Sequence, residues 1–163
     1  MNLRQRHLWT NPFRQDTLEA RVLGTWRNTP LLHGIPAGVA QKLVALTHLR
    51  QYQPGEAVFR EGDNAVAAAV IVSGHIIVRS HDQDIARLEP GDFFGEAALL
   101  EDTPRSASAI ADGVTQVSLL MRYQFEEFVR HRPQAGLEIM TNLAHLLLAR
   151  LHRGNISRNG QDE

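Results

Sequence analysis

A carboxylate, the start of a short helix and an arginine lie close together in residues 91–107, which read Gly-Asp-Phe-Phe-Gly-Glu-Ala-Ala-Leu-Leu-Glu-Asp-Thr-Pro-Arg-Ser-Ala. Gly95 opens a run of good helix formers, so the first backbone amides of that helix have no intrahelical partner and favour an anion. Arg105 adds a planar fork of donors that suits phosphate oxygens. Glu96 would repel a phosphate unless it accepted a hydrogen bond from the same ligand, such as a ribose hydroxyl. Phosphate and ribose together predict a nucleotide site.

This string resembles the phosphate-binding cassette of cyclic-nucleotide-binding domains, the family of kinase regulatory subunits, nucleotide-gated channels and catabolite-activator-type regulators. The match is Phe-Gly-Glu at residues 94–96, then small or aliphatic residues and a short loop, then Pro-Arg-Ser-Ala at residues 104–107. The resemblance implies that Glu96 accepts the ribose 2′-hydroxyl and that Arg105 pairs with the cyclic phosphate. It also implies that the phosphate shell is completed by backbone amides of Gly95, Glu96, Ala97 and Ala98, with Ser106 or Ala107.

Each of these residues also has an ordinary structural interpretation. Glu96 would offset the helix dipole in the first turn, and Arg105 would be its salt-bridge partner across the loop. For a single Glu or Arg that interpretation is the more common one. The whole string at this spacing, with Gly95 and Pro104 in place, favours the nucleotide site.

Composition limits the class of protein. The chain has 163 residues and is 43% hydrophobic, which is enough for one domain with its own core. It has no cysteine, which excludes disulfides, thiolate metal sites and a cysteine nucleophile. The longest apolar run, residues 65–72, is far shorter than the ~20 residues that span a bilayer, and residues 1–6 lack an apolar signal core. We therefore expect a soluble, cytoplasmic protein with no membrane span. The net charge of −1 gives no reason to expect a direct nucleic-acid partner.

Eight histidines raise the alternative of a metal-dependent enzyme on a similar small β-barrel. His75 and His81 lack the close His-x-His spacing with a following Glu that such sites use, and the other histidines are scattered. No serine lies in a nucleophile-elbow pattern, and no carboxylate pair suggests hydrolysis. We therefore expect no catalytic residue, no metal site, no cofactor and no enzyme activity.

Short strands with turn residues between them surround the cassette. Leu18, Val22 and Trp26 recur at helical spacing and predict a helix over residues 17–27, and Pro36 begins a second helix. Turn signals that include Ser73-Gly74 and Asp112-Gly113-Val114 separate predicted strands at residues 57–59, 68–72, 75–78, 85–88, 108–111 and 115–120. The predicted fold is mainly β with flanking helices: an antiparallel β-roll, jelly-roll-like, with N-terminal helices, a short cassette helix and two C-terminal helices.

The resemblance extends beyond the cassette, over about residues 31–153. Gly55, Gly62 and Gly74 fall where the family has turn glycines. One departure is the alanine run at residues 67–69, where related domains usually carry an aromatic residue, so we expect a thinner wall of the roll. The chain then divides into an N-terminal arm and helix (1–30), a cyclic-nucleotide-binding domain that includes the C-terminal helices (31–153) and a polar tail (154–163).

Two C-terminal helices are predicted over residues 123–132 and 134–152. The longer one carries one apolar stripe of Leu137, Met140, Ala144, Leu147 and Leu151, and a second of Ile139, Leu143, Leu146 and Arg150. Either one stripe packs on the roll and the other on the first helix, or one of them forms a dimer seam or a lid over the base. In the resembling family this helix closes over the base, which implies base-capping by Leu146, Leu147 or Arg150.

These observations predict a cyclic-nucleotide receptor that signals by moving its C-terminal helices against an unidentified effector protein. We favour cAMP, and Ser106 keeps cGMP open because its hydroxyl could bond a guanine amino group. Residues 153–163 are too few for a helix-turn-helix, so a sensor without its own output is expected. Three alternatives stay open: a homodimer, a transcription-regulator-like dimer whose DNA-binding part comes from another chain, and a related fold that no longer binds ligand.

Overall fold

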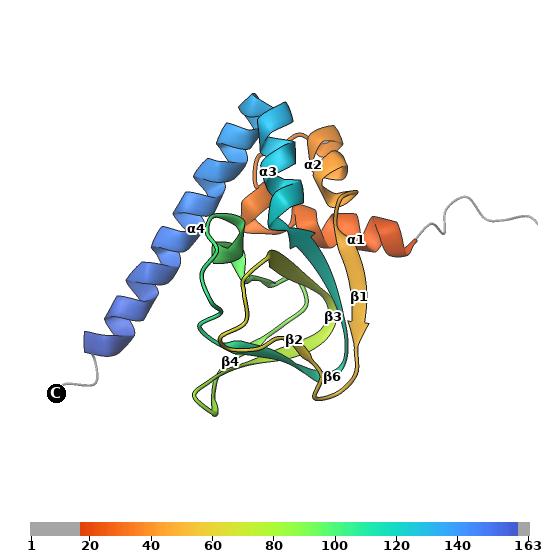
Figure 1. Cartoon of the computed structure of the whole chain (residues 1–163). Coiled ribbons are helices and arrows are strands. Elements are labelled where there is room, and N and C mark those ends of the chain that lie inside the picture. Colours follow the sequence, from red (N-terminus) through yellow and green to blue (C-terminus); the bar gives the residue numbers. More distant parts are fainter. Residues whose placement is uncertain (1–16, 160–163) are drawn as a thin grey trace, which may run out of the picture.

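Two long strands, β3 (Ala67–Ser80) and β6 (Ser108–Met121), pair antiparallel along most of their length and form the centre of the sheet. The order across the sheet is β1-β6-β3-β4, with β1 at His48–Tyr52 and β4 at Gln83–Leu88. Two short strands complete the six: β2 (Ala57–Phe59) on β6 and β5 (Phe93–Phe94) on β3. The sheet curls into a roll in Figure 1, which confirms the predicted fold.

The computed structural model describes residues 17–159, with side chains to residue 152. Its helices are α1 (Leu18–Arg27), the 3-10 turn η1 (Pro30–Leu32), α2 (Ala37–Val44), the 3-10 turn η2 (Glu96–Leu99), α3 (Arg122–His131) and α4 (Pro133–Asn159). No helix in this described part of the chain is long and apolar enough to cross a bilayer. The last helix runs past the predicted end near residue 152 and continues through Gly154 to Asn159, with no proline after Pro133.

Each of the two long strands contains a glycine, Gly74 in β3 and Gly113 in β6, at a position where the sequence predicted a turn between two shorter strands. Gly74 has φ +81, and a Cβ there would lie 2.5 Å from Thr115 Oγ1, so only glycine fits. The register of β3 on β6 shifts on both sides of Ser73, which makes this an irregularity inside one strand. The chain does not reverse at Ser73-Gly74 or at residues 112–114, so these two predicted turns are wrong. The two sites lie opposite each other on the paired strands, and both strands continue past them.

The helices cover one end of the roll. Trp26 of α1 is fully buried, and its Nε1 donates a 2.8 Å hydrogen bond to Ser118 Oγ on β6. Thr17 is the N-cap of α1, since its Oγ1 accepts from the amide of Ala20. A second cluster of apolar side chains, which includes Tyr52, lies inside the roll itself. The core is therefore divided between a helical layer and the roll interior.

The two stripes of α4 differ sharply in exposure. Ile139 and Leu143 are fully buried in the helical core, whereas Leu137 is 71% and Leu151 is 58% exposed. α4 packs on η1 and α3, while α1 lies across the other side of the helical layer (Figure 1). The alternative that the Leu137/Leu151 stripe packs on the first helix is therefore wrong for these two residues.

Candidate functional site

A cavity of about 740 Å³ lies between the cassette, the inner face of the roll and α4. Its volume is within the range of about 300–1,000 Å³ that is usual for small-molecule sites. Nine of the residues predicted from sequence line it: Gly95, Glu96, Ala97, Ala98, Arg105, Ser106, Ala107, Leu146 and Arg150. Leu147, the remaining capping candidate, does not line the cavity and packs instead against the helical core.

The cassette turn depends on Gly95. This residue has φ +69, in the left-handed region that favours glycine, and a Cβ there would lie 2.7 Å from Nη1 of Arg105. The following helix is only the four-residue turn η2, so its dipole is small. The amide of Ala98 donates to the carbonyl of Gly95 at 3.2 Å. It is therefore already engaged, contrary to the expectation that it is free for an anion.

Arg105 is buried, with 9% of its surface exposed. Its Nη1 and Nη2 donate to the carbonyls of Gly95 and Ala67, and its guanidinium lies 3.8 Å from the centre of the Phe59 ring. Its Nε is buried without a hydrogen-bond partner among the described residues. The guanidinium is thus held in place by neutral groups and keeps an unused donor.

Burial also acts on the charge of Arg105. Desolvation lowers the pKa of this guanidinium below the usual arginine value, while the carboxylates of Asp63 and Glu96 act in the opposite direction. Arginine remains protonated at neutral pH even so. The cavity therefore contains a fixed, partly desolvated positive charge, which favours an anionic ligand.

Glu96 is buried as well and is paired with the C-terminal helix. Nη1 of Arg150 lies 2.6 Å from both carboxylate oxygens of Glu96, and Nη2 of Arg150 donates to the carbonyl of Phe93. The side chain of Glu96 is 8% exposed and that of Arg150 is 41% exposed. Arg150 thus reaches from α4 into the cavity wall and offsets a buried negative charge.

Three groups in this site were not predicted from the sequence. The Phe59 ring under Arg105 lies on β2, and the carbonyls of Ala67 and Phe93 belong to β3 and β5. A backbone carbonyl leaves no mark in a sequence, so two of the three could not have been found. The alanine run that was expected to thin the wall has a defined role here, since residues 67–69 are buried and Ala67 accepts from Arg105.

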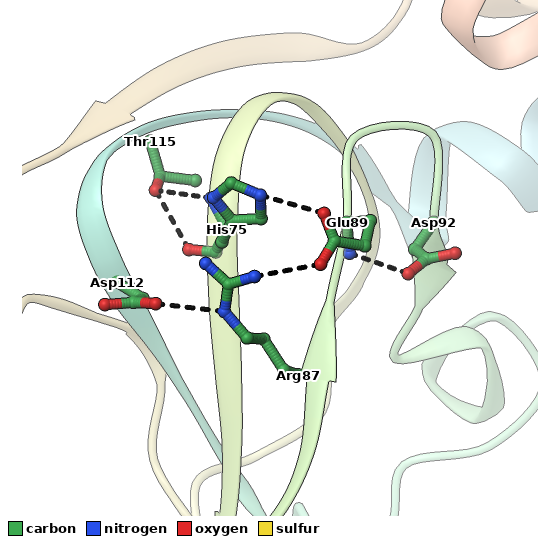
Figure 2. Close-up of polar contacts among 6 residues, drawn as sticks. All are labelled: His75, Arg87, Glu89, Asp92, Asp112 and Thr115. Atoms are coloured by element: carbon green, nitrogen blue, oxygen red, sulfur yellow. Dashed lines mark hydrogen bonds and ion pairs between the residues drawn. The ribbon is translucent and has the colours of Figure 1, made fainter.

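A polar network holds the loop that leads into the cassette. In Figure 2, Glu89 bridges His75 of β3 and Arg87 of β4, at 2.8 and 2.9 Å. Arg87 also reaches Asp112 of β6, and the amide of Glu89 donates to Asp92. These side chains are largely exposed, so each pair contributes little to stability alone. Together they tie the start of the loop to three neighbouring strands.

Comparison with known proteins identifies the family. A family profile described as "Cyclic nucleotide-binding domain" matches residues 49–132, more than half of the chain. The chain therefore belongs to the cyclic nucleotide-binding domain family. Its relatives include the cyclic AMP receptor protein of Thermus thermophilus, at 31% identity over 80% of this chain and 61% of that protein. A cAMP-dependent protein kinase regulatory subunit from Hypocrea atroviridis is 29% identical over 61% of this chain and 22% of that protein.

Solved structures agree with this assignment. The crystal structure of the Thermus thermophilus catabolite activator protein superimposes with a TM-score of 0.72 at 31% identity, over 80% of this chain and 62% of that one. A cyclic nucleotide-binding domain from Methylobacillus flagellatus shares the fold, with a TM-score of 0.77 at 21% identity, over 89% of this chain and 84% of that one. The chain spans at most about 61% of the length of the curated relatives named above.

The fit between Gly95 and Arg105 can be tested by a matched pair of substitutions. Gly34 has a similar φ of +76, but nothing lies within 4 Å of a Cβ built there. Both Gly95→Ala and Gly34→Ala should lose about 1 kcal/mol of unfolding free energy through backbone strain. Gly95→Ala should lose about 1–3 kcal/mol more because its methyl group displaces a buried guanidinium. Equal losses in urea denaturation would show that Arg105 is not held as described.

Proposed function

We propose that this chain is a non-enzymatic receptor module that binds a cyclic nucleotide, cAMP ahead of cGMP, in the cavity between the cassette and α4. The observation that carries this proposal is the environment of the Arg105 guanidinium. Within the described part of the chain, its guanidinium is buried, bonds only to neutral carbonyls and retains a free Nε. A buried cation in this condition is relieved by an anion of the right size beside it.

The rest of the cavity suits the other parts of such a ligand. Glu96 would accept the ribose 2′-hydroxyl, and the amides of Gly95, Glu96 and Ala97 would surround the phosphate. Ser106 or Ala107 would complete this shell. The wall formed by Val78, Leu88 and Ala109 is apolar and would cover the sugar and base. Relatives named for cAMP favour that nucleotide.

Binding to variants of Arg105 and Glu96 tests the proposal. Isothermal titration calorimetry with cAMP should show that Arg105→Gln and Glu96→Gln each lose about 1.5–3 kcal/mol, which is roughly tenfold or more in Kd. Arg122→Gln is a matched control, because Arg122 is also a largely buried arginine that bonds a carbonyl, that of Ala65, but it does not line the cavity.

The controls separate the alternatives. Titration with cGMP and with the linear nucleotide 5′-AMP measures the choice of ligand. If the folded wild-type protein bound no nucleotide, the chain would be a family member that no longer binds ligand. If cAMP bound tightly and equally to both cavity variants, the assigned roles of Arg105 and Glu96 would be wrong.

We also propose that the C-terminal helix carries the signal, with Arg150 as the link. Glu96 is the carboxylate expected to meet the ribose, and it already binds Arg150 of α4 at 2.6 Å. An anionic ligand beside Glu96 needs this negative charge offset, and Arg150 provides the offset only while α4 is docked. Ligand binding and docking of α4 would then stabilise each other, as linkage requires.

A double-mutant cycle measures this link. Arg150→Gln should weaken cAMP binding about tenfold, in line with the loss of a charged contact. In the Glu96→Gln background the same change should have at most a twofold effect, because the partner charge is gone. Arg130→Gln is the control, since Arg130 is an exposed arginine paired only with Glu127 among the described residues. Tighter binding to Arg150→Gln would mean instead that Arg150 competes with the ligand.

The exposed face of α4 supports a proposal about assembly. Its outward stripe is Leu137, Thr141, Ala144, Leu148 and Leu151, with alternating spacings of four and three. Leu137, Leu148 and Leu151 are 71%, 51% and 58% exposed. This is the spacing of a two-stranded coiled coil, so we expect a homodimer through α4. A helix that pairs in this way could pass ligand-dependent movement to an effector protein.

Sedimentation velocity tests the dimer. The wild-type protein should sediment as a dimer, and Leu148→Glu should be monomeric because it buries a charge in the seam. Tyr123→Glu serves as the control, since Tyr123 is 62% exposed on α3 and lies outside the stripe. A monomeric wild-type protein at the highest soluble concentration would contradict the assignment.

A further inference from the structure

A second groove, of about 650 Å³, is lined by residues of α1, α2 and β1 and of the turn between α2 and β1. In Figure 1 these three elements lie on the opposite side of the helical layer from α4. The groove is bounded by the first turns of α1, the end of α2 and the start of β1. Its apolar wall is formed by Leu18, Val22, Leu23, Val44, Ala45 and Leu49. None of the residues that line the cassette cavity takes part in this groove.

The groove exposes apolar surface that the described residues do not cover. Leu18 is 41% exposed, and Leu23 and Leu49 are only partly buried against the core. Its polar members are Thr17, Glu19, Gln41 and Thr47, of which the first three are exposed. An apolar groove with a polar rim on a small domain is typical of a docking surface for a peptide segment with apolar anchors.

The segment best placed to fill this groove is the start of the same chain. Sixteen residues precede Thr17, and Thr17 itself lines the groove, so the segment joins the protein at this site. Its apolar side chains include Leu8, Trp9 and Phe13. Phe13 is four residues from Thr17, so it lies within about 13 Å of the groove wall.

The sequence of this segment suits a return path. Asn11-Pro12 stands between Trp9 and Phe13, and Asn-Pro favours a turn. Such a turn would bring both aromatic side chains toward one surface. Arg14 would then lie near Glu19 at the rim, with opposite charge. A tethered segment also has an effective concentration in the millimolar range, which a free partner rarely reaches.

We propose that residues 8–13 of this chain dock into the groove between α1, α2 and β1, with Trp9 and Phe13 as the anchors. The docked segment covers Leu18 and clamps the start of α1 to the end of α2. This surface is independent of the cassette and of nucleotide binding. It assigns a binding role to the aromatic residues that precede α1.

Disulfide trapping tests the proposal, because the natural chain has no cysteine and every thiol is introduced. In the protein of residues 1–163, the pair Thr10→Cys and Ala45→Cys, which leaves both proposed anchors in place, should form an intramolecular disulfide with oxidised glutathione, since docking brings the two positions within bridging distance. The control pair is Thr10→Cys and Ile85→Cys, because Ile85 is 60% exposed on β4, away from the groove. The groove pair should cross-link at least tenfold faster.

A third substitution separates docking from simple tethering. Leu18→Asp places a charge in the groove, and because Leu18 is partly exposed the fold should tolerate it. It should slow cross-linking of the groove pair to the control rate, and circular dichroism confirms that the variant is folded. Groove and control pairs that react equally fast, or no effect of Leu18→Asp, would overturn the proposal. A disulfide-linked dimer would overturn it in favour of a second copy as the occupant.

Discussion

The pairing of β3 with β6 is the constraint on which the rest of the structure depends. Each of the other strands hydrogen-bonds to one of these two, and the cassette arginine lies just before β6 begins. Arg105 reaches the carbonyl of Ala67, the first residue of β3. A slip of the pairing by one residue would turn every side chain to the opposite face. The position of the guanidinium in the cavity is therefore set by strand register.

The cavity combines three buried or partly buried charges whose balance depends on two separate elements. Arg105 is fixed by the roll, whereas Glu96 is paired with a residue of α4. Removing one partner of a buried ion pair is costly because the other is left uncompensated. In this protein, the docking of α4 and the balance of charge in the ligand site therefore depend on each other. This arrangement makes the site sensitive to the position of α4.

The correct and the wrong predictions from sequence have the same physical origin. Predictions from local sequence were correct where local forces decide the structure: the cassette string, the helical spacing of Val22 and Trp26, and the turn glycines Gly55 and Gly62, which have φ +81 and +86. They failed at Gly74, where a glycine interpreted as a reversal is a bend inside a long strand. A left-handed glycine serves either purpose, and only the partner strand determines which. The same limit applied to α4, whose two stripes look alike in sequence and differ in exposure.

The sequence by itself determined the family, the roll and the residues that gather around the cavity, because these follow from a short contiguous string and from alternating apolar strands. Tertiary structure decided how those residues are used. It paired Arg150 with Glu96 across 54 positions, left Leu147 outside the cavity and engaged the amide of Ala98. Contacts between distant segments depend on packing and register, and no local pattern encodes the distance between two side chains.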